Sequence, residues 1–192
     1  MNHLLVYAHP NPASFNHAIE ETVRHTLEAQ GHAVVVRDLY ALNFNPVLSA
    51  ADTAALRSGT PPADIAEEQA HVAWADVVSF VYPTWWVGMP AILKGYIDRV
   101  FSYGFAFAYG EQGPIGLLKG KKAFLVSTGG NPEQWYTAMQ EALTHPADGS
   151  LTFCGIEVLA HKYLPGVLSV DDAARHAMLA DVKRLVGELA AA

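Results

Sequence analysis

Short apolar runs alternate along the chain with segments whose apolar residues recur every three or four positions. Residues 3–8 form an apolar run that ends before a proline, which favours a buried strand over a helix. Residues 15–30 place their apolar side chains on one stripe, with the period of a helix. Ser14 stands where an N-cap residue is expected, and Gly31 stands where helices commonly end. A second strand over 33–36 completes a βαβ unit.

The same alternation continues to the end of the chain. Later strands are predicted over 77–82, 123–126 and 156–159. Helices are predicted over 64–74, 90–102, 133–143 and 171–190, with Pro90 at the first position of its helix. Strands that alternate with helices form a parallel sheet that is covered on both faces. Five such strands with right-handed crossovers suit the order 2-1-3-4-5. We therefore predict a flavodoxin-like three-layer α/β/α sandwich, built as one domain over residues 1–192.

Composition excludes several kinds of protein and partner. The chain is 51% hydrophobic and 16% charged, which argues against disorder. Its formal net charge of −7 argues against nucleic acid as a partner, because an acidic protein gains nothing from the phosphate backbone. Cys154 is the one cysteine, so no intrachain disulfide can form, as suits a reducing cytosol. The first residues lack signal-peptide features, and no apolar run reaches the ~20 residues of a membrane helix. We expect a cytoplasmic protein without membrane insertion.

The loop over residues 9–16, which follows the first strand, has the groups that a phosphate needs. Ser14 offers a hydroxyl, Asn16 an amide and His9 an imidazole, and the N–H groups that open a helix favour an anion. Taken alone, the loop fits a structural role better, in which Ser14 caps the helix while His9 and the prolines shape a turn. The nine histidines show no HExxH motif or paired ligand spacing, so no metal site is predicted.

Two further loops are unusual and should meet the first at one edge of the sheet. Residues 82–90 carry Trp85 and Trp86, which would stack on a planar ligand or seal the sheet's end or a dimer interface. Residues 127–136 contain a Gly-Gly pair that permits close approach of the backbone, although, taken alone, an ordinary loop that leaves a strand explains it better. Ligands of open α/β sheets bind beyond the carboxyl ends of the strands. Together, the three loops suit the flavin mononucleotide half of a cofactor.

An aromatic run covers residues 101–110. Phe105, Phe107 and Tyr109 alternate with a period of two, which would suit one face of a strand, but the flanking glycines favour a loop. The run would wall a pocket for a flat apolar substrate or pack against a second subunit. Cys154, in an apolar context, is expected to be a small buried residue and not a nucleophile.

Most of the chain resembles the NAD(P)H dehydrogenase (quinone) family, the flavodoxin-like group that includes DT-diaphorase, bacterial modulators of drug activity and potassium-efflux ancillary proteins. Four segments carry the resemblance: AHPNPASFNHAI (8–19), YPTWWVGMPAILKGYIDRVFSYGFAFAYG (82–110), LKGKKAFLVSTGG (118–130) and FCGIEVL (153–159). The second segment is long and specific. The Ser/Thr-rich phosphate loop of true flavodoxins is absent from the sequence.

The resemblance implies a role for each matching position. The flavin phosphates would be held by His9, Ser14, Phe15 and Asn16. The isoalloxazine and its polar edge would be lined by Pro83, Thr84, Trp85, Trp86 and Val87. An acidic position of the flavin site would be Asp98. The loop near the flavin pyrimidine would consist of Ser127, Thr128, Gly129 and Gly130. The aromatic walls of the substrate pocket would be Trp86, Tyr109 and Phe153, the last completed across a dimer interface.

The resemblance also implies the catalytic groups. Amides near Gly129 and Gly130 are candidates to stabilise negative charge on the reduced flavin. In the DT-diaphorase branch a Tyr and then a His follow the Gly-Gly pair. Tyr136 lies one residue beyond the matching position and is the candidate proton donor to the quinol oxygen. His145 does not match the spacing, so no Tyr–His relay is predicted.

The implied activity is a ping-pong reduction of quinones or similar electrophiles. NAD(P)H would pass a hydride to bound FAD, or alternatively FMN, and the acceptor would then take it in the same pocket. A homodimer is implied as well. One alternative is a regulatory flavoprotein that binds a potassium-efflux transporter, and another is a binding module without flavin.

Overall fold

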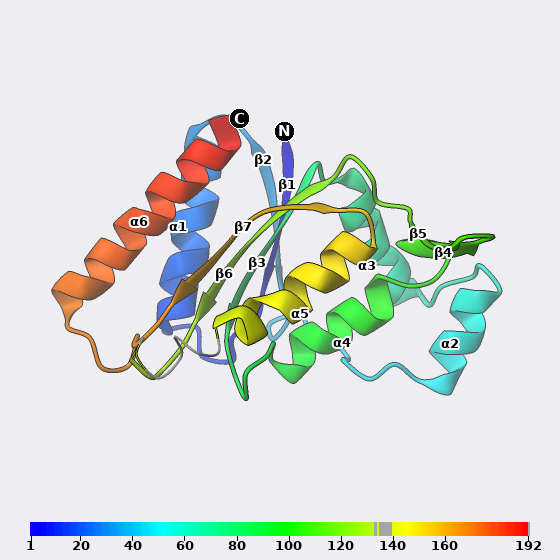
Figure 1. The fold of residues 1–192 in the computed structure, drawn as a ribbon, viewed down its shortest axis with the longest axis horizontal. Coiled ribbons are helices and arrows are strands. Elements are labelled where there is room, and N and C mark those ends of the chain that lie inside the picture. Colours follow the sequence, from blue (N-terminus) through cyan, green and yellow to red (C-terminus); the bar gives the residue numbers. More distant parts are fainter. Residues whose placement is uncertain (133, 135–139, 192) are drawn as a thin grey trace.

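The computed structural model describes residues 1–132, 134 and 140–191. Five parallel strands form one sheet in the order β2-β1-β3-β6-β7, as predicted. The strands are β1 (Asn2–Tyr7), β2 (Ala33–Asp38), β3 (Val77–Pro83), β6 (Lys122–Thr128) and β7 (Glu157–Leu164). Their carboxyl ends lie at the same edge of the sheet, which is the lower edge in Figure 1.

Helices cover both faces of this sheet, so the predicted three-layer sandwich is confirmed (Figure 1). The helices are α1 (Phe15–Ala29), α2 (Ala50–Arg57), α3 (Ala63–Trp74), α4 (Ala91–Val100), α5 (Gln140–Phe153) and α6 (Asp172–Ala191). Side chains of α1 and α6 form one core with alternate strand residues, and those of α3, α4 and α5 form a second core with the others. No helix among the described residues is long and apolar enough to cross a bilayer.

The two predicted caps of the first helix are confirmed. The Ser14 hydroxyl accepts a hydrogen bond from the N–H of His17 (3.2 Å). Gly31 follows α1 with φ +79°, a conformation that glycine adopts without steric cost. Pro90 differs from its prediction: it is the N-cap residue of α4 and has an extended backbone, and the helix begins at Ala91.

Three further elements differ from what the sequence analysis expected. α2 was missed because it is only eight residues long, although Ser49 and Asp52 form a capping box at its start. The helix predicted to end at residue 143 continues to Phe153 through Pro146, because Ala147 and Leu151 beyond the proline are buried in the core. The aromatic run is not a loop throughout.

That run contributes one strand of an antiparallel hairpin outside the main sheet. β4 (Phe107–Gly110) pairs with β5 (Gly113–Gly116), and Phe107 lies opposite Gly116. Gly116 has no side chain to keep it from the backbone of Cys154, which lies directly against it. Of the two glycines in the aromatic run, Gly104 has φ +84° in the turn before the strand, and Gly110 is the last residue of β4, so neither interrupts the strand.

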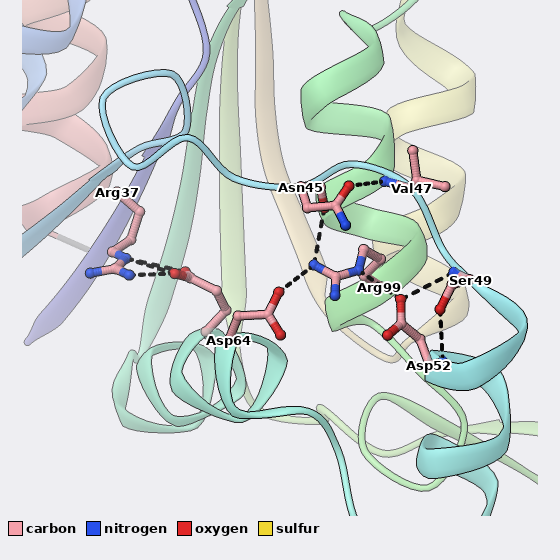
Figure 2. Close-up of polar contacts among 8 residues, drawn as sticks. Arg37, Asn45, Val47, Ser49, Asp52, Asp64 and Arg99 are labelled. Atoms are coloured by element: carbon pink, nitrogen blue, oxygen red, sulfur yellow. Dashed lines mark hydrogen bonds and ion pairs between the residues drawn. The ribbon is translucent and has the colours of Figure 1, made fainter.

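A buried arginine ties the long β2–α3 connection to the body of the protein (Figure 2). The side chain of Arg99, on α4, is 3% exposed. Its guanidinium donates to Asp64 at the start of α3 (2.6 Å), to Asp52 on α2 (3.2 Å) and to the carbonyl of Asn45 (3.0 Å). The ring of Phe44 lies against it as well, 5.4 Å from the guanidinium carbon. One cation thus holds two helices and a loop in register.

Candidate functional site

A cleft of about 530 Å³ opens at the carboxyl edge of the sheet. It is lined by loops after β1, β3, β6 and β7: His9, Asn11, Ala13, Ser14, Phe15, Asn16, Pro83, Thr84, Trp85, Thr128, Gly130, Val167, Leu168 and Arg175. All three loops singled out in the sequence contribute to it. Their convergence follows from the parallel strand order, because ligands of such sheets bind where the strand order reverses.

The first loop brings a helix N-terminus to the cleft. Ser14 caps α1 and also lies 3.3 Å from the hydroxyl of Tyr7. The Nδ1 atom of His9 lies 3.0 Å from the backbone nitrogen of Asn11 and 3.2 Å from its carbonyl oxygen, so the imidazole is held against its own turn. Burial lowers the pKa of His9, so the ring is neutral at neutral pH. The loop therefore has the structural role considered for it, because it caps α1 and turns the chain, and it also lines the cleft.

Two buried polar atoms on the cleft lack a partner among the residues that the structure describes. Asn16 donates from Nδ2 to the hydroxyl of Thr128 (2.9 Å), but its Oδ1 accepts nothing there. The hydroxyl of Thr84 is likewise unpartnered in the described part of the chain. A buried polar atom without a hydrogen bond costs about 1–3 kcal/mol. A ligand that accepts from Thr84 and donates to Asn16 would remove that cost.

The second loop is a strained turn. Trp85 and Gly88 exchange two backbone hydrogen bonds (3.0 and 3.1 Å), and the two residues between them, Trp86 and Val87, have φ of +50° and +64°. These features define a type I′ turn, which normally contains Asn and Gly. Positive φ at a β-branched residue is a true outlier. Trp86 is fully exposed, and neither central residue lines the cleft, whereas Trp85 does.

The third loop differs from its prediction in two ways. Ser127 and Thr128 belong to β6, and Ser127 points to the α5 face, where its hydroxyl bonds His161 (3.0 Å). The N–H of Gly129 donates to the carbonyl of Leu164 (2.9 Å), so this amide already has a partner within the chain. Gly130 lines the cleft. Tyr136, the predicted proton donor, lies outside the described residues.

The sequence analysis missed a fourth side of the cleft. Val167 and Leu168 follow β7, and Arg175 lies in the first turn of α6. Nε of Arg175 donates to the carbonyl of Val167 (3.3 Å), and the same guanidinium pairs with Asp172 (2.6 Å). The strand-order rule could have found this loop, because the fifth strand ends at the same edge as the others.

The predicted aromatic walls lie elsewhere on the chain. Tyr109 and Phe153 are exposed and both contact Phe107, with ring centroids 5.8 and 5.2 Å apart, in a cluster on the hairpin. Asp98, the predicted acidic residue of the flavin site, pairs with Lys94 (2.5 Å) and borders a second groove between α2 and α4. Within one chain, neither set reaches the cleft.

Fold and cleft together define a doubly wound α/β protein with a cleft at the carboxyl edge of its parallel sheet. The family described as the flavodoxin-like fold matches residues 1–186, and the chain belongs to this family. An uncharacterized NAD(P)H oxidoreductase of Haemophilus influenzae is 39% identical over 183 residues, which cover 93% of this chain and 91% of that protein.

Named enzymes are among the relatives. NAD(P)H dehydrogenase [quinone] 1 of Cavia porcellus is 35% identical, over 94% of this chain and 74% of its own length. The solved structure of NAD(P)H:quinone oxidoreductase from Methanothermobacter marburgensis has a TM-score of 0.84 and 30% identity, with 98% of each chain covered. These similarities confirm the family resemblance seen in the sequence, and they place the chain among the NAD(P)H oxidoreductases of this fold.

Proposed function

We propose that this protein reduces quinones or similar electrophiles with NAD(P)H, by means of a flavin bound in the cleft. One observation carries the proposal: the N-terminus of α1 and two unpartnered buried polar groups, on Asn16 and Thr84, converge on one cleft. A flavin nucleotide has a phosphate for the helix N-terminus and a ring edge that both accepts and donates hydrogen bonds. Family membership supports the same function.

Different residues of the cleft would contact different parts of the cofactor. Ser14 and the first N–H groups of α1 would hold the phosphate, and the imidazole of His9 would contact it. Thr84, Trp85 and Gly130 line the ring. The bound flavin supplies hydride acceptance and donation, and the protein supplies placement and exclusion of water. Because donor and acceptor would use the same pocket in turn, we expect ping-pong kinetics.

Arg175 favours FAD over FMN. Its guanidinium stands on the cleft at the opening of α6, apart from the loop that follows β1. A second phosphate and an adenine ring would extend from α1 toward it, since guanidinium groups both pair with phosphate and stack on aromatic rings. FMN has no group to reach this side.

We further propose that the acceptor pocket is completed by a second copy of the chain. Tyr109, Phe153 and Trp86 are exposed in one chain and suit an interface. Apposition of the hairpin cluster with the Trp86 turn of another copy would wall a flat apolar pocket above the ring. No observation on the described residues favours the regulatory or flavin-free alternatives, and we do not propose them.

The first test is the absorption spectrum of the purified protein and the mass of the cofactor released by heat. We expect a flavin spectrum, the mass of FAD, and NAD(P)H oxidation that depends on added quinone. A colourless protein that binds neither FAD nor FMN would contradict the proposal.

A matched pair of variants at Ser14 tests the phosphate site. Asp and Asn both cap helices well, so Ser14→Asp and Ser14→Asn should fold equally. The Asp carboxylate would repel the phosphate and weaken flavin nucleotide binding on the order of 100-fold. The Asn variant should bind within a few fold of the parent, and riboflavin, which has no phosphate, should bind both variants alike. Equal loss of FAD by both variants would remove Ser14 from the phosphate site.

A further inference from the structure

A second polar cluster lies buried between α5 and the sheet. His161 on β7 is its centre, with a side chain that is 4% exposed. Its Nδ1 lies 2.8 Å from a carboxylate oxygen of Asp148 on α5. Its Nε2 lies 3.0 Å from the hydroxyl of Ser127 and 3.3 Å from that of Tyr82, on β6 and β3. Four elements distant in sequence thus meet at one imidazole.

The order of Ser127, His161 and Asp148 is that of a hydrolytic triad, but hydrolysis does not fit. Ser127 and Tyr82 are each 1% exposed, so no substrate carbonyl can reach the hydroxyl of Ser127. The cluster is instead an imidazole with a partner at each nitrogen, and this imidazole can be neutral or protonated in place.

The partners of His161 suit both its neutral and its charged form. Asp148 accepts from Nδ1–H in either state. A hydroxyl can donate to a neutral Nε2 or accept from a protonated one by rotating its hydrogen, so Ser127 and Tyr82 satisfy both states without movement of heavier atoms. Burial lowers the pKa of His161, and the Asp148 carboxylate opposes that shift. Among the described residues, Asp148 and Tyr82 are the titratable groups that face the imidazole.

The cluster adjoins the cleft along the strands. Tyr82 and Ser127 are paired across β3 and β6, and the next pair, Pro83 and Thr128, lines the cleft. Successive strand residues rise about 3.3 Å, which places His161 on the order of 10 Å from the cleft floor. At that separation, a negative charge in the cleft raises the pKa of a buried histidine by about one unit.

We propose that His161, with Asp148, Ser127 and Tyr82, is a buried proton-binding site that compensates negative charge arising in the adjacent cleft. The inference rests on the proposed function for the source of that charge: a hydride adds two electrons and one proton to the bound ring, which leaves one negative charge. His161 then takes one proton from solvent past the partly exposed Asp148, and it releases that proton when the acceptor removes the hydride. His161 is a positioning residue, because it touches neither ring nor substrate.

The test is the pH dependence of the midpoint potential of the protein-bound flavin. For a two-electron couple, each proton taken up adds about 30 mV per pH unit to the slope. Midway between the His161 pKa values of the oxidised and reduced protein, which differ by about one unit, reduction changes the proton occupancy of His161 by about half a proton. The slope of the parent should therefore be steeper there, by about 15 mV per pH unit, than that of His161→Gln, whose side chain cannot titrate. His71→Gln, at a partly exposed histidine on α3, should keep the parent's slope.

NMR titration of the His161 ring supplies the second readout. Its pKa should rise by about one unit when the flavin in the full chain is reduced with dithionite. In Asp148→Asn, which keeps the imidazole, the pKa should fall in both states. Equal slopes for the parent and His161→Gln, or a His161 pKa that ignores reduction, would overturn the proton site while flavin turnover stands. A chain that binds no flavin would overturn the proposed function, and the proton site with it.

Discussion

Two polar regions of this molecule are buried to a similar degree and differ in how their groups are satisfied. Around Arg99, each group that the structure describes has a charged or carbonyl partner: two carboxylates and a backbone oxygen surround the guanidinium. At the cleft, the buried Asn16 Oδ1 and Thr84 hydroxyl find no partner among the described residues. The Arg99 network holds segments of the chain together, and the unpartnered groups of the cleft are available to a ligand.

The contrast separates stability from binding. Removal of a group from the satisfied region leaves its partners buried without a hydrogen bond or a counter-charge, so the free energy of unfolding should fall. Removal of an unpartnered group removes a cost from the free chain, so folding should hold or improve while a ligand is lost. His3 on β1 tests a third case, because it is buried, has no hydrogen-bond partner in the described part of the chain, and lies at the amino end of the sheet, far from the cleft.

The largest effect is expected at Arg99. Arg99→Ala would leave the carboxylate of Asp52 without its cation and free the loop at Asn45, at a cost of about 3 kcal/mol in the free energy of unfolding. Urea denaturation measures it. Arg184→Ala, which breaks ion pairs on the surface of α6, should leave the free energy of unfolding almost unchanged. Equal losses in the two variants would show that the Arg99 network is not what anchors α2 and its loop.

A pH effect of about 2 kcal/mol is expected from His3. Burial, with the nearby His32 and the N-terminal amine, lowers the pKa of His3 to about 4. Between pH 6.5 and 4 the unfolded chain therefore binds more protons than the folded chain. The contribution of neutral His3 to the free energy of unfolding is complete above pH 6.5 and is lost as the pH falls through this window. Urea unfolding at pH 7 and pH 5 measures the loss. His3→Leu should flatten it, whereas His25→Gln, at an exposed position, should not; an unchanged pH profile in His3→Leu would contradict the assignment.

Relief of the strained turn should stabilise the protein by about 1 kcal/mol. Val87→Gly removes a β-branched residue at positive φ, and strain of this kind costs on the order of 1–3 kcal/mol. Asn43→Gly is the matched control, because Asn43 also has positive φ (49°) but tolerates it, so its stability should change by only a few tenths of a kcal/mol. If the turn shapes the ligand site, Val87→Gly also weakens flavin binding. A destabilised Val87→Gly would show that the turn carries no strain.

The smallest effect on folding is expected at Thr84. Thr84→Val keeps the shape and removes the unpartnered hydroxyl, so the flavin-free chain should be as stable as the parent or more stable by about 0.5 kcal/mol. Its affinity for flavin should fall about tenfold, as fluorescence titration would show. Thr53→Val should behave oppositely, because that hydroxyl donates to the Ser49 carbonyl (3.0 Å): stability falls and flavin affinity holds. Unchanged flavin affinity in Thr84→Val would remove this hydroxyl from the site.

Much of the fold could be predicted because its signals are local. The period of apolar residues located the five main strands and most helices, and Ser14 and Gly31 marked the ends of α1. Elements without such a period were not predicted. α2 is too short to show one, and the glycines near the hairpin favoured a loop over a strand. The length of β6 was also underestimated, and this error moved Ser127 into a loop, although the alternation with Val126 assigns it to the other face of the sheet.

The sequence by itself determined the layers, the strand order and the edge at which a ligand binds, since these follow from the alternation of elements and the handedness of their connections. Only the tertiary structure decided which distant side chains meet. Arg99 takes its carboxylates from residues 47 and 35 positions away, and His161 joins four elements at one ring. Such contacts depend on register and on side-chain direction across packed layers, and no local period encodes either.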